Sequence, residues 1–359
     1  MKTLGIASGD FRSCQDSPGG KTPSWGGSGW ARIGQYIPYF KEEYNVVYGT
    51  LYSNKGFLGV ECDITKRLYT PDILITQRLM NDGIANDCRH SVNSGMVVIQ
   101  DIDDWYWALD HRNAAWKGAH PKYNKARNTD HYTRSILASS MVVASTPWIA
   151  DMSASKFSLP TEIIPNYVDI DRFTRVEQDV TAPKLGWVGS TAHRSGDLEL
   201  MRGILRQFTD DYQMYHGGDN PHNPQAETFA HRVGLPEDVV EKVSWCLPEY
   251  YPNLMSMQLG IIPLRDIPFN HAKSDIKGLE YAACGIPFIS SYSPSYEALR
   301  TSWGGSFDIA YKPKDWIRAI KKYTDLSYRQ EKSDEVFDRV KSRDIRRGAD
   351  LWLELLRSL

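Results

Sequence analysis

The sequence has few cysteines, little net charge and no long apolar run, and each shortage excludes a class of protein. Its five cysteines are scattered and contain no Cys-x-x-Cys pair, which disfavours a disulfide framework or a zinc site and indicates reduced thiols. The net charge of −2 gives no overall field that would attract nucleic acid or a membrane surface. No stretch approaches the roughly 20 apolar residues that span a bilayer, and the apolar start is too short for a signal peptide. We therefore expect a cytoplasmic protein without a transmembrane segment, with nucleic acid disfavoured as a partner.

What the sequence does contain is an alternation of short apolar runs with amphipathic segments along its 359 residues. This pattern is typical of buried parallel strands connected by helices. The first series of predicted strands is 3–8, 44–49, 72–76, 96–101 and 141–146, and the second is 184–190, 212–218, 243–247, 259–264 and 286–291. Helical periodicity is present in 30–43, 125–140 and, most clearly, 197–208. The fold class predicted is α/β, with two doubly wound, Rossmann-like domains facing across a cleft.

A glycine-rich stretch, "SPGGKTPSWGGSGWARI" (17–33), follows the first predicted strand. Gly26, Gly27 and Gly29 would let backbone N–H groups approach a phosphate or a sugar closely. The spacing is not the G-x-G-x-x-G dinucleotide fingerprint. A simply flexible loop is the alternative.

A cluster of acids and aromatics, "VVIQDIDDWYW" (97–107), follows the fourth predicted strand. Asp101, Asp103 and Asp104 could orient sugar hydroxyls, transfer protons or hold a divalent metal. The alternative is a helix N-cap with solvated charges.

The stretch "GWVGSTAHRSGDLELM" (186–201) again runs from a strand through a Gly/Ser loop towards a helix. Its loop offers backbone donors, and His193 and Arg194 offer positive charge to a diphosphate. His193 as an ordinary surface residue is the alternative.

The stretch "FNHAKSDIKGLEYAACGIPFISS" (269–291) places two lysines where a helix should begin. Lys273, Lys277 and Glu280 have the i, i+4, i+7 spacing of one helical face. Cations are disfavoured at a helix start, whereas a bound anion there would be stabilised by both lysines and by the free N–H groups. The sequence therefore predicts a diphosphate site. Glu280, one helical turn further along, would accept hydrogen bonds from hydroxyl groups. The alternative is a surface ion pair between Lys277 and Glu280.

These stretches together resemble the family 4-type glycosyltransferases (glycosyl transferases group 1), which have the GT-B fold. The strand before "PLRDIPFNHAKSDIKGLEYAACGIPFI", with "IIPNYVD" and "GWVGS", is similar to the nucleotide-sugar half of that family. The glycine stretch, "QDIDDWYW" and "VVASTPWIADM" match the N-terminal half in the same order. The resemblance implies an acceptor-side domain at 1–168, completed by a returning C-terminal helix at 343–359, and a nucleotide-sugar domain at 169–342.

The resemblance also implies a reaction and its residues. A sugar moves from a nucleoside diphosphate, UDP or GDP, to an unidentified acceptor such as a glycan or a protein, with retention of configuration and without a metal or other cofactor. Glu280 would bind the ribose, and the helix start with its basic residues would bind the diphosphate. The predicted donor-binding residues are Gly27, Gly189, Ser190, Arg194, Lys273, Ser274, Lys277 and Glu280. The predicted acceptor-binding residues are Trp25, Gly26, Asp101 and Trp105, and the predicted catalytic residues are Asp103, Asp104, Arg194 and Lys273.

Two features depart from the family pattern and keep alternatives open. The family usually has a second glutamate eight residues before the first, where this chain has Ala272. The Arg–Lys pair usual after the first strand of the second domain is only half present. One alternative is a metal-dependent transferase with Asp101 and Asp103 as a DxD motif. The other is a glycan- or nucleotide-binding protein without catalytic activity.

Overall fold

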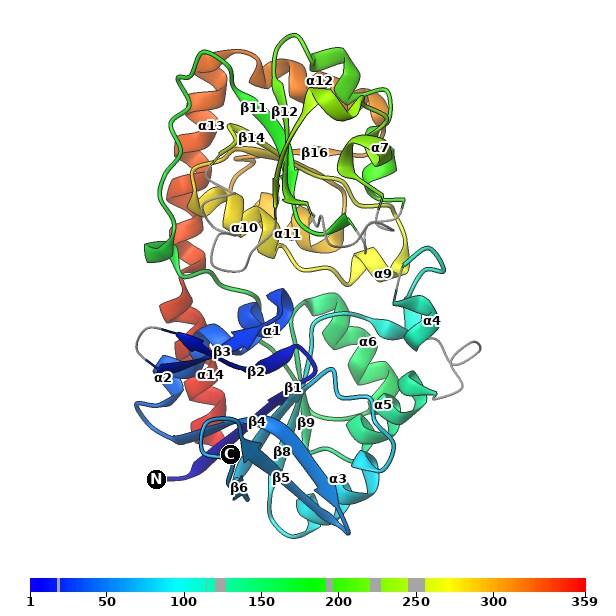
Figure 1. The fold of residues 1–359 in the computed structure, drawn as a ribbon, viewed down its shortest axis with the longest axis vertical. Coiled ribbons are helices and arrows are strands. Elements are labelled where there is room, and N and C mark those ends of the chain that lie inside the picture. Colours follow the sequence, from blue (N-terminus) through cyan, green and yellow to red (C-terminus); the bar gives the residue numbers. More distant parts are fainter. Residues whose placement is uncertain (18–19, 114, 120–126, 192–195, 220–226, 245–255) are drawn as a thin grey trace. The chain divides into compact units, whose positions relative to one another are not determined.

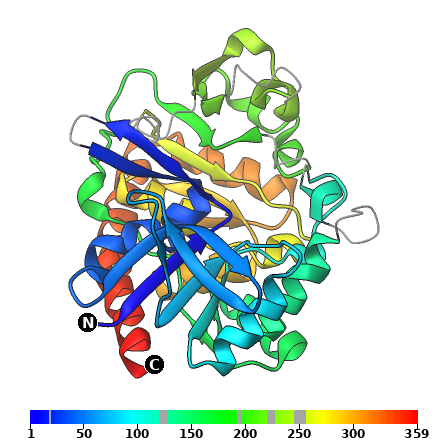
Figure 2. The same cartoon turned by 60° about the horizontal axis from the view of Figure 1, so that its bottom comes forward.

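The computed structural model describes residues 1–17, 20–113, 115–119, 127–191, 196–219, 227–244 and 256–359. The chain forms two compact units. The first unit comprises Met1–Leu109, Lys117–Asn166 and Ile345–Leu359, and the second comprises Asp110–Trp116 and Tyr167–Asp344. Both chain termini therefore belong to the first unit (Figures 1 and 2). The predicted domains differ from this division by a few residues at each boundary and by the segment 110–116.

The first unit is built on one sheet of eight strands in the order β10-β9-β8-β7-β1-β4-β5-β6 (Figure 1). Strands β10 to β4 of this order are parallel, and β5 and β6 extend the sheet in antiparallel pairing. The strands are β1 (Thr3–Ser8), β4 (Asn45–Asn54), β5 (Phe57–Cys62), β6 (Leu68–Tyr69), β7 (Ile73–Gln77), β8 (Val97–Ile102), β9 (Met141–Ala144) and β10 (Thr161–Ile163). The helices are α3 (Ile84–Asn93), α4 (Trp116–Ala119), α5 (Asn128–Leu137), α6 (Pro147–Phe157) and α14 (Ile345–Ser358).

The connection from β1 to β4 differs from the prediction. It begins with an antiparallel hairpin, β2 (Phe11–Ser17) and β3 (Gly20–Trp25), which takes up much of the predicted glycine loop. The predicted helix 30–43 is wrong as one helix, because the chain forms α1 (Gly27–Arg32), a 3-10 turn (Gly34–Tyr36) and α2 (Ile37–Phe40). An added Cβ at Gly34 would lie 3.0 Å from the Trp25 indole. This close approach, and the proline in the first turn of α2, break the segment into short turns.

The last helix, α14, packs into the core of the first unit. Trp352 is fully buried, and its ring centroid lies 6.1 Å from that of Phe40 and 6.5 Å from that of Tyr36. The amphipathic pattern of the chain end therefore serves to bury one helix face against residues from near the chain start.

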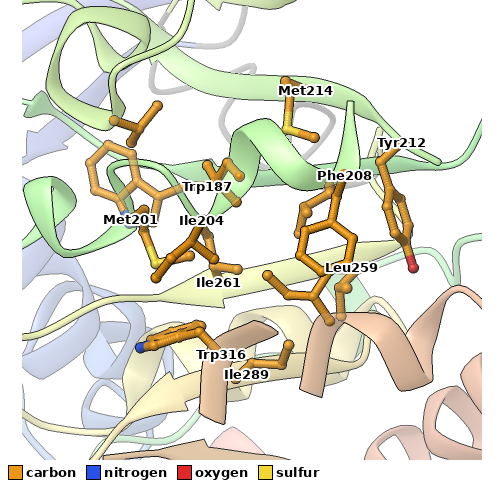
Figure 3. Close-up of a cluster of buried hydrophobic side chains, with 14 of the residues drawn as sticks. Trp187, Met201, Ile204, Phe208, Tyr212, Met214, Leu259, Ile261, Ile289 and Trp316 are labelled. Carbon is orange, nitrogen blue, oxygen red and sulfur yellow. The ribbon is translucent and has the colours of Figure 1, made fainter. Parts of the chain in front are cut away.

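The second unit is built on a six-stranded parallel sheet in the order β13-β12-β11-β14-β15-β16. Its strands are β11 (Lys184–Val188), β12 (Gln213–Asp219), β13 (Val240–Ser244), β14 (Leu259–Ile262), β15 (Phe288–Ser291) and β16 (Asp308–Ala310). Its helices are α7 (Phe229–Val233), α9 (Pro268–His271), α10 (Ile276–Ala283), α11 (Pro294–Ser302), α12 (Pro313–Tyr323) and α13 (Leu326–Arg339). Figure 3 shows part of its core, in which Trp187, Leu259 and Ile289 of the sheet pack with Met201, Phe208 and Trp316.

Two predicted elements of the second unit are placed differently. The segment 197–208 is not one helix but two 3-10 turns, Leu198–Met201 and Leu205–Phe208. Gly203 has a φ of +73° between them, a conformation that ends a helix. Strand β13 begins at Val240, earlier than the predicted strand 243–247, and residues 245–247 lie outside the described part of the chain.

Each sheet reverses its strand order next to its first strand, as doubly wound folds do. The predicted fold class, α/β with two Rossmann-like domains, is therefore confirmed. Within the described ranges, no helix has the length and apolar character needed to cross a membrane. The cytoplasmic location stays a prediction.

Candidate functional site

The candidate residues of the first unit follow the carboxyl ends of adjacent parallel strands, where α/β sheets bind their ligands. Asp10 lies just after β1, Arg78 directly after β7, and Asp103 directly after β8, and these three strands are neighbours in the sheet. This alignment brings together charged side chains that are far apart in the sequence.

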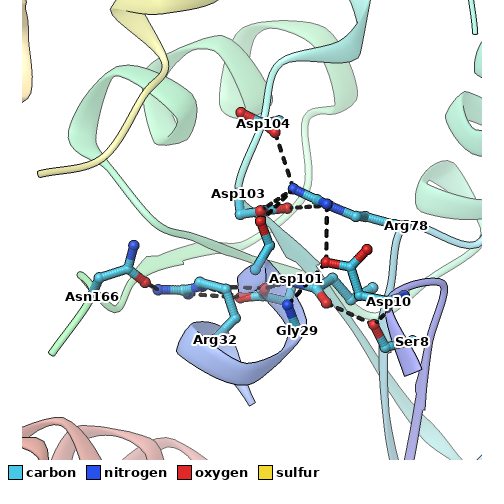
Figure 4. Close-up of polar contacts among 11 residues, drawn as sticks. Ser8, Asp10, Gly29, Arg32, Arg78, Asp101, Asp103, Asp104 and Asn166 are labelled. Carbon is cyan, nitrogen blue, oxygen red and sulfur yellow. Dashed lines mark hydrogen bonds and ion pairs between the residues drawn. The ribbon is translucent and has the colours of Figure 1, made fainter. Parts of the chain in front are cut away.

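Arg78 is the centre of this cluster (Figure 4). Its guanidinium donates hydrogen bonds to Asp10 Oδ2 at 3.0 Å, to Asp103 Oδ1 at 2.9 Å and to Asp104 Oδ2 at 3.0 Å. It also bonds the second oxygen of Asp103, and it donates to Ser28 Oγ at 2.8 Å. One arginine thus connects the start of α1 to three carboxylates. We call these five residues the Arg78 network.

Arg78 was not predicted from the sequence, although Asp103 and Asp104 were. A single arginine in "TQRLMND" matches no motif, and its importance depends on the neighbouring strands. Arg78 also has a φ of +56°, which is uncommon for a residue other than glycine and costs about 1–3 kcal/mol. The four surrounding contacts hold it in this conformation.

Burial and charge shift the protonation equilibria in the Arg78 network. Burial raises the pKa of Asp103, Arg78 opposes this shift, and the adjacent Asp104 adds to it. Burial lowers the pKa of Arg78, but Asp103, Tyr106, Asp104 and Asp10 together raise it well above its usual value. The arginine is therefore charged at any physiological pH.

Asp101 lies in a second, fully buried contact. Arg32 Nη2 is 2.7 Å from Asp101 Oδ1, and its Nη1 donates to Asn166 Oδ1 at 3.0 Å and to the Ile164 carbonyl at 2.6 Å. Gln77 Nε2 donates to the other oxygen of Asp101 at 3.2 Å. This geometry favours a structural role for Asp101, which ties α1 to β8. Its contact with an acceptor stays a prediction.

The other predicted residues of the first unit differ in exposure. Trp25 and Trp105 are buried, and each is 3% exposed. Gly26 precedes α1 and donates its N–H to the Asp10 carbonyl at 2.8 Å. Gly27 is exposed, and an added Cβ there would meet no atom within 4 Å. The packing of this unit thus does not itself require glycine at position 27.

In the second unit, the segment from β14 to α10 holds four of the predicted donor-binding residues, Lys273, Ser274, Lys277 and Glu280. The helix α10 begins at Ile276 with Asp275 as its N-cap. The predicted helical face is therefore wrong in part, because Lys273 precedes the helix and does not lie above Lys277. Lys273 Nζ lies 4.4 Å from the centroid of the Phe269 ring, a cation–π contact.

Lys277 and Glu280 lie on α10 itself. Their charged atoms are 3.8 Å apart, and the two side chains are 13% and 15% exposed. The distance is too long for a strong hydrogen bond. Asp275 contributes a negative charge at the helix start, and Arg343 holds it through two hydrogen bonds of 3.0 Å. The lysine charge at this helix start is thus partly compensated within the second unit.

The loop after β11 is held by backbone contacts. Gly189 has a φ of +146°, and its N–H donates to the Gly217 carbonyl at 2.7 Å. An added Cβ at Gly189 would lie 2.9 Å from the Trp187 ring, so this position requires glycine. Ser190 follows and is exposed. Arg194 and His193 lie outside the described residues.

A further polar cluster of the second unit was not predicted, although its residues stand in or beside the quoted stretches. Asp197 Oδ1 accepts hydrogen bonds from the Arg265 N–H at 3.0 Å and from Asn270 Nδ2 at 2.8 Å. Arg265 Nη2 lies 3.0 Å from Asp110 Oδ1. Burial raises the pKa of Asp110, but hydrogen bonds from the Arg112 N–H and from Arg265 lower it overall. This cluster fixes the chain between β14 and α9.

No protein-family model matches the chain, and no curated protein matches its sequence. Solved structures nevertheless share its fold. Sucrose-phosphate synthase from Thermosynechococcus elongatus has a TM-score of 0.67 at 13% identity, covering 100% of this chain and 99% of its own. HepE from Anabaena in complex with UDP-glucose has a TM-score of 0.68 at 12% identity, covering 100% of both chains. A glycosyltransferase from Rickettsia africae has a TM-score of 0.64 at 10% identity, covering 99% and 98%.

These neighbours are glycosyltransferases of the GT-B fold, and they match the chain over its whole length. The predicted GT-B fold is therefore confirmed. Membership of the family 4 type, or group 1, stays a prediction.

Proposed function

We propose that this chain is a glycosyltransferase that moves a sugar from a nucleoside diphosphate to an acceptor, with retention of configuration and without a metal. The observation that carries the proposal is the start of α10. Lys273, Ser274, Lys277 and Glu280 follow β14, which is next to the strand-order reversal of the second sheet. Structures of HepE, which has this fold, contain UDP or UDP-glucose.

The donor diphosphate is bound at the helix start. Backbone N–H groups of the first turn of α10 point away from the helix and donate to phosphate oxygens. Lys273 and Lys277 add two positive charges, and Gly189 and Ser190 follow β11, the strand adjacent to β14. As the bond to the sugar breaks, negative charge develops on the departing diphosphate. Preorganised cations and dipoles at this position lower the energy of that charge.

Glu280 binds the ribose of the nucleotide. Its carboxylate lies one turn into α10, close to Lys277 but beyond strong hydrogen-bonding distance. A ribose hydroxyl donating to this carboxylate would form a charge-assisted hydrogen bond. Lys277 remains near enough to stabilise the negative charge of Glu280 when the nucleotide is bound.

The acceptor is bound at the Arg78 network of the first unit. Asp104 has a side chain that is 15% exposed, and Arg78 holds one of its oxygens. Asp103 is more buried and is fixed by two bonds from the same guanidinium. We therefore assign Asp104 to orient the acceptor hydroxyl and Asp103 to set the position and charge of the network.

The contacts of Asp101 and Asp103 favour this proposal over a metal-dependent transferase. A DxD motif needs both carboxylates directed at a divalent ion. Here Asp101 is bound to Arg32 and Asp103 to Arg78, so guanidinium groups already supply the positive charge.

The test is a thermal-shift and turnover measurement on the full chain. UDP, GDP and their sugars are added with and without EDTA, and release of nucleoside diphosphate is followed. We expect stabilisation by one nucleotide, and slow donor hydrolysis that persists in EDTA. Nucleotide binding that is lost in EDTA and restored by Mn²⁺ or Mg²⁺ would support the metal-dependent alternative. Nucleotide binding with neither donor hydrolysis nor transfer to any tested glycan would support a binding protein.

A further inference from the structure

Two tyrosines of the second unit differ from every other described aromatic side chain. Tyr292 is 37% exposed and Tyr311 is 64% exposed, whereas the remaining described Trp, Tyr and Phe residues are buried or half-buried. These two exposed rings stack on each other, with centroids 5.5 Å apart and planes at 24°. Exposed apolar groups that gather in one place mark binding surfaces more often than isolated ones do.

The pair is held in place by the fold. Tyr292 directly follows β15 and Tyr311 directly follows β16, which are adjacent parallel strands. The Tyr292 N–H donates to the Ala310 carbonyl at 3.3 Å, and the Tyr311 N–H donates to Asp315 Oδ2 at 3.3 Å. The Tyr311 hydroxyl donates to Glu297 Oε2 at 3.0 Å. Little conformational entropy is therefore lost when a ligand contacts the rings.

The position of the pair connects it to the candidate donor site. The Leu264 N–H donates to Ser291 Oγ at 2.9 Å, and this bond joins the segment after β14 to the residue before Tyr292. The tyrosines thus lie on the same carboxyl edge of the second sheet as the start of α10.

We propose that the Tyr292–Tyr311 pair is a subsite that binds a sugar ring of a saccharide, with Glu297 accepting a hydroxyl hydrogen bond. A flat aromatic face beside a carboxylate fits the apolar face and the hydroxyl rim of a pyranose. The choice of a saccharide over another flat ligand rests on the proposed function.

A protein partner fits this surface less well. The other exposed large apolar side chains described in the second unit are Leu200 and Leu326, which belong to other elements. A protein interface needs a wider buried patch around its anchor residues. A pair of rings of this size suits one or two sugar rings.

The experiment measures binding of maltohexaose, cellohexaose and chitohexaose to the full chain by calorimetry. Wild type is compared with Tyr311→Ala, Tyr292→Ala and Tyr311→Phe. Tyr52→Ala is the control, because Tyr52 belongs to a half-buried aromatic pair, with Phe57, in the first unit. We expect at least one hexasaccharide to bind wild type and Tyr52→Ala equally. Its Kd should rise about tenfold in either tyrosine-to-alanine variant and by less in Tyr311→Phe, which keeps the ring.

The proposal is overturned if no hexasaccharide binds, or if all variants bind as wild type does. It is also overturned if the tyrosines instead mediate binding of an oligothymidylate, or self-association detected by sedimentation. UDP is titrated into the same samples and should bind each variant as it binds wild type. Saccharide binding without UDP binding would support this subsite and contradict the proposed function. UDP binding without saccharide binding would support the proposed function and contradict this subsite.

Discussion

Replacing Arg78 by alanine tests whether the carboxylates of the first unit depend on one counter-ion. The substitution removes the hydrogen bonds to Asp10, Asp103 and Asp104 at once, together with the bond to Ser28. Three carboxylates then lose the counter-ion that they share. We expect a less stable protein rather than a small local change.

The magnitude follows from the burial of the partners. Removing one member of a buried ion pair costs about 3–5 kcal/mol, because the remaining charge stays desolvated. The side chains of Arg78 and Asp10 are 17% and 22% exposed, so water screens part of this cost. We therefore expect the free energy of unfolding to fall by about 3 kcal/mol near neutral pH.

The loss should depend on pH in a defined direction. Burial already raises the pKa of Asp103 and Arg78 opposes that shift, so without Arg78 the folded-state pKa of Asp103 rises further above its unfolded value. The folded state then binds more protons than the unfolded state between those values, and stability falls as the pH rises through that window. Urea unfolding of Arg78→Ala and of wild type is measured at about pH 7 and at about pH 5. The difference between the two proteins in the free energy of unfolding should be smaller at the lower pH.

The control for this comparison is Lys341→Ala, which removes an exposed ion pair with Asp338. We expect it to cost less than about 1 kcal/mol at either pH. A loss in Arg78→Ala that is equally small, or that is the same at both pH values, would refute the electrostatic reasoning and leave only a packing role.

Three further substitutions test other parts of the account. Trp352→Ala should lower the free energy of unfolding by about 3–5 kcal/mol, because this fully buried ring fixes α14 in the first unit; a loss below 1 kcal/mol by urea unfolding would contradict that packing. Gly196→Ala should cost about 1–3 kcal/mol, since the new Cβ would lie 2.5 Å from Arg265 Nε at a φ of +87°; unchanged melting would show that the loop adapts. Lys273→Ala and Lys277→Ala should slow donor turnover while changing the free energy of unfolding by only a few tenths of a kcal/mol. A sharp drop in melting temperature would show instead that these lysines have a structural role.

Most of the parallel strands could be predicted from the sequence because their cores are continuous apolar runs, but the three-residue edge strands β10 and β16 were not predicted. Strand β1 occupies the predicted range 3–8, and its residues Leu4 and Ile6 are fully buried. The antiparallel strands β5 and β6 were missed, since their short alternating patterns depend on pairing with β4. Segment 197–208 looked helical by periodicity, yet the backbone of Gly203 interrupts it.

The candidate sites were predictable only where their residues are close in sequence. Lys277 and Glu280 share one helix, so their proximity follows from helical spacing. Arg78 and Asp10 come from different strands, and only the strand order brings them to Asp103. Asp101 was predicted for the acceptor by its place beside Asp103. Asp101 lies within β8 and is fully buried against Arg32, whereas Asp103 follows the end of that strand, and this difference in burial is not visible in the sequence.

Calorimetric titration of UDP and GDP tests whether the second unit binds a nucleoside diphosphate at α10. The titration compares wild type with Glu280→Gln, which keeps the size of the side chain and removes its charge. We expect one nucleotide to bind wild type without added metal. We expect the variant to bind that nucleotide about 10- to 150-fold more weakly, as for a lost charge-assisted hydrogen bond of about 1.5–3 kcal/mol. Equal affinity of the two proteins, or no binding of either nucleotide to wild type, would contradict binding at α10.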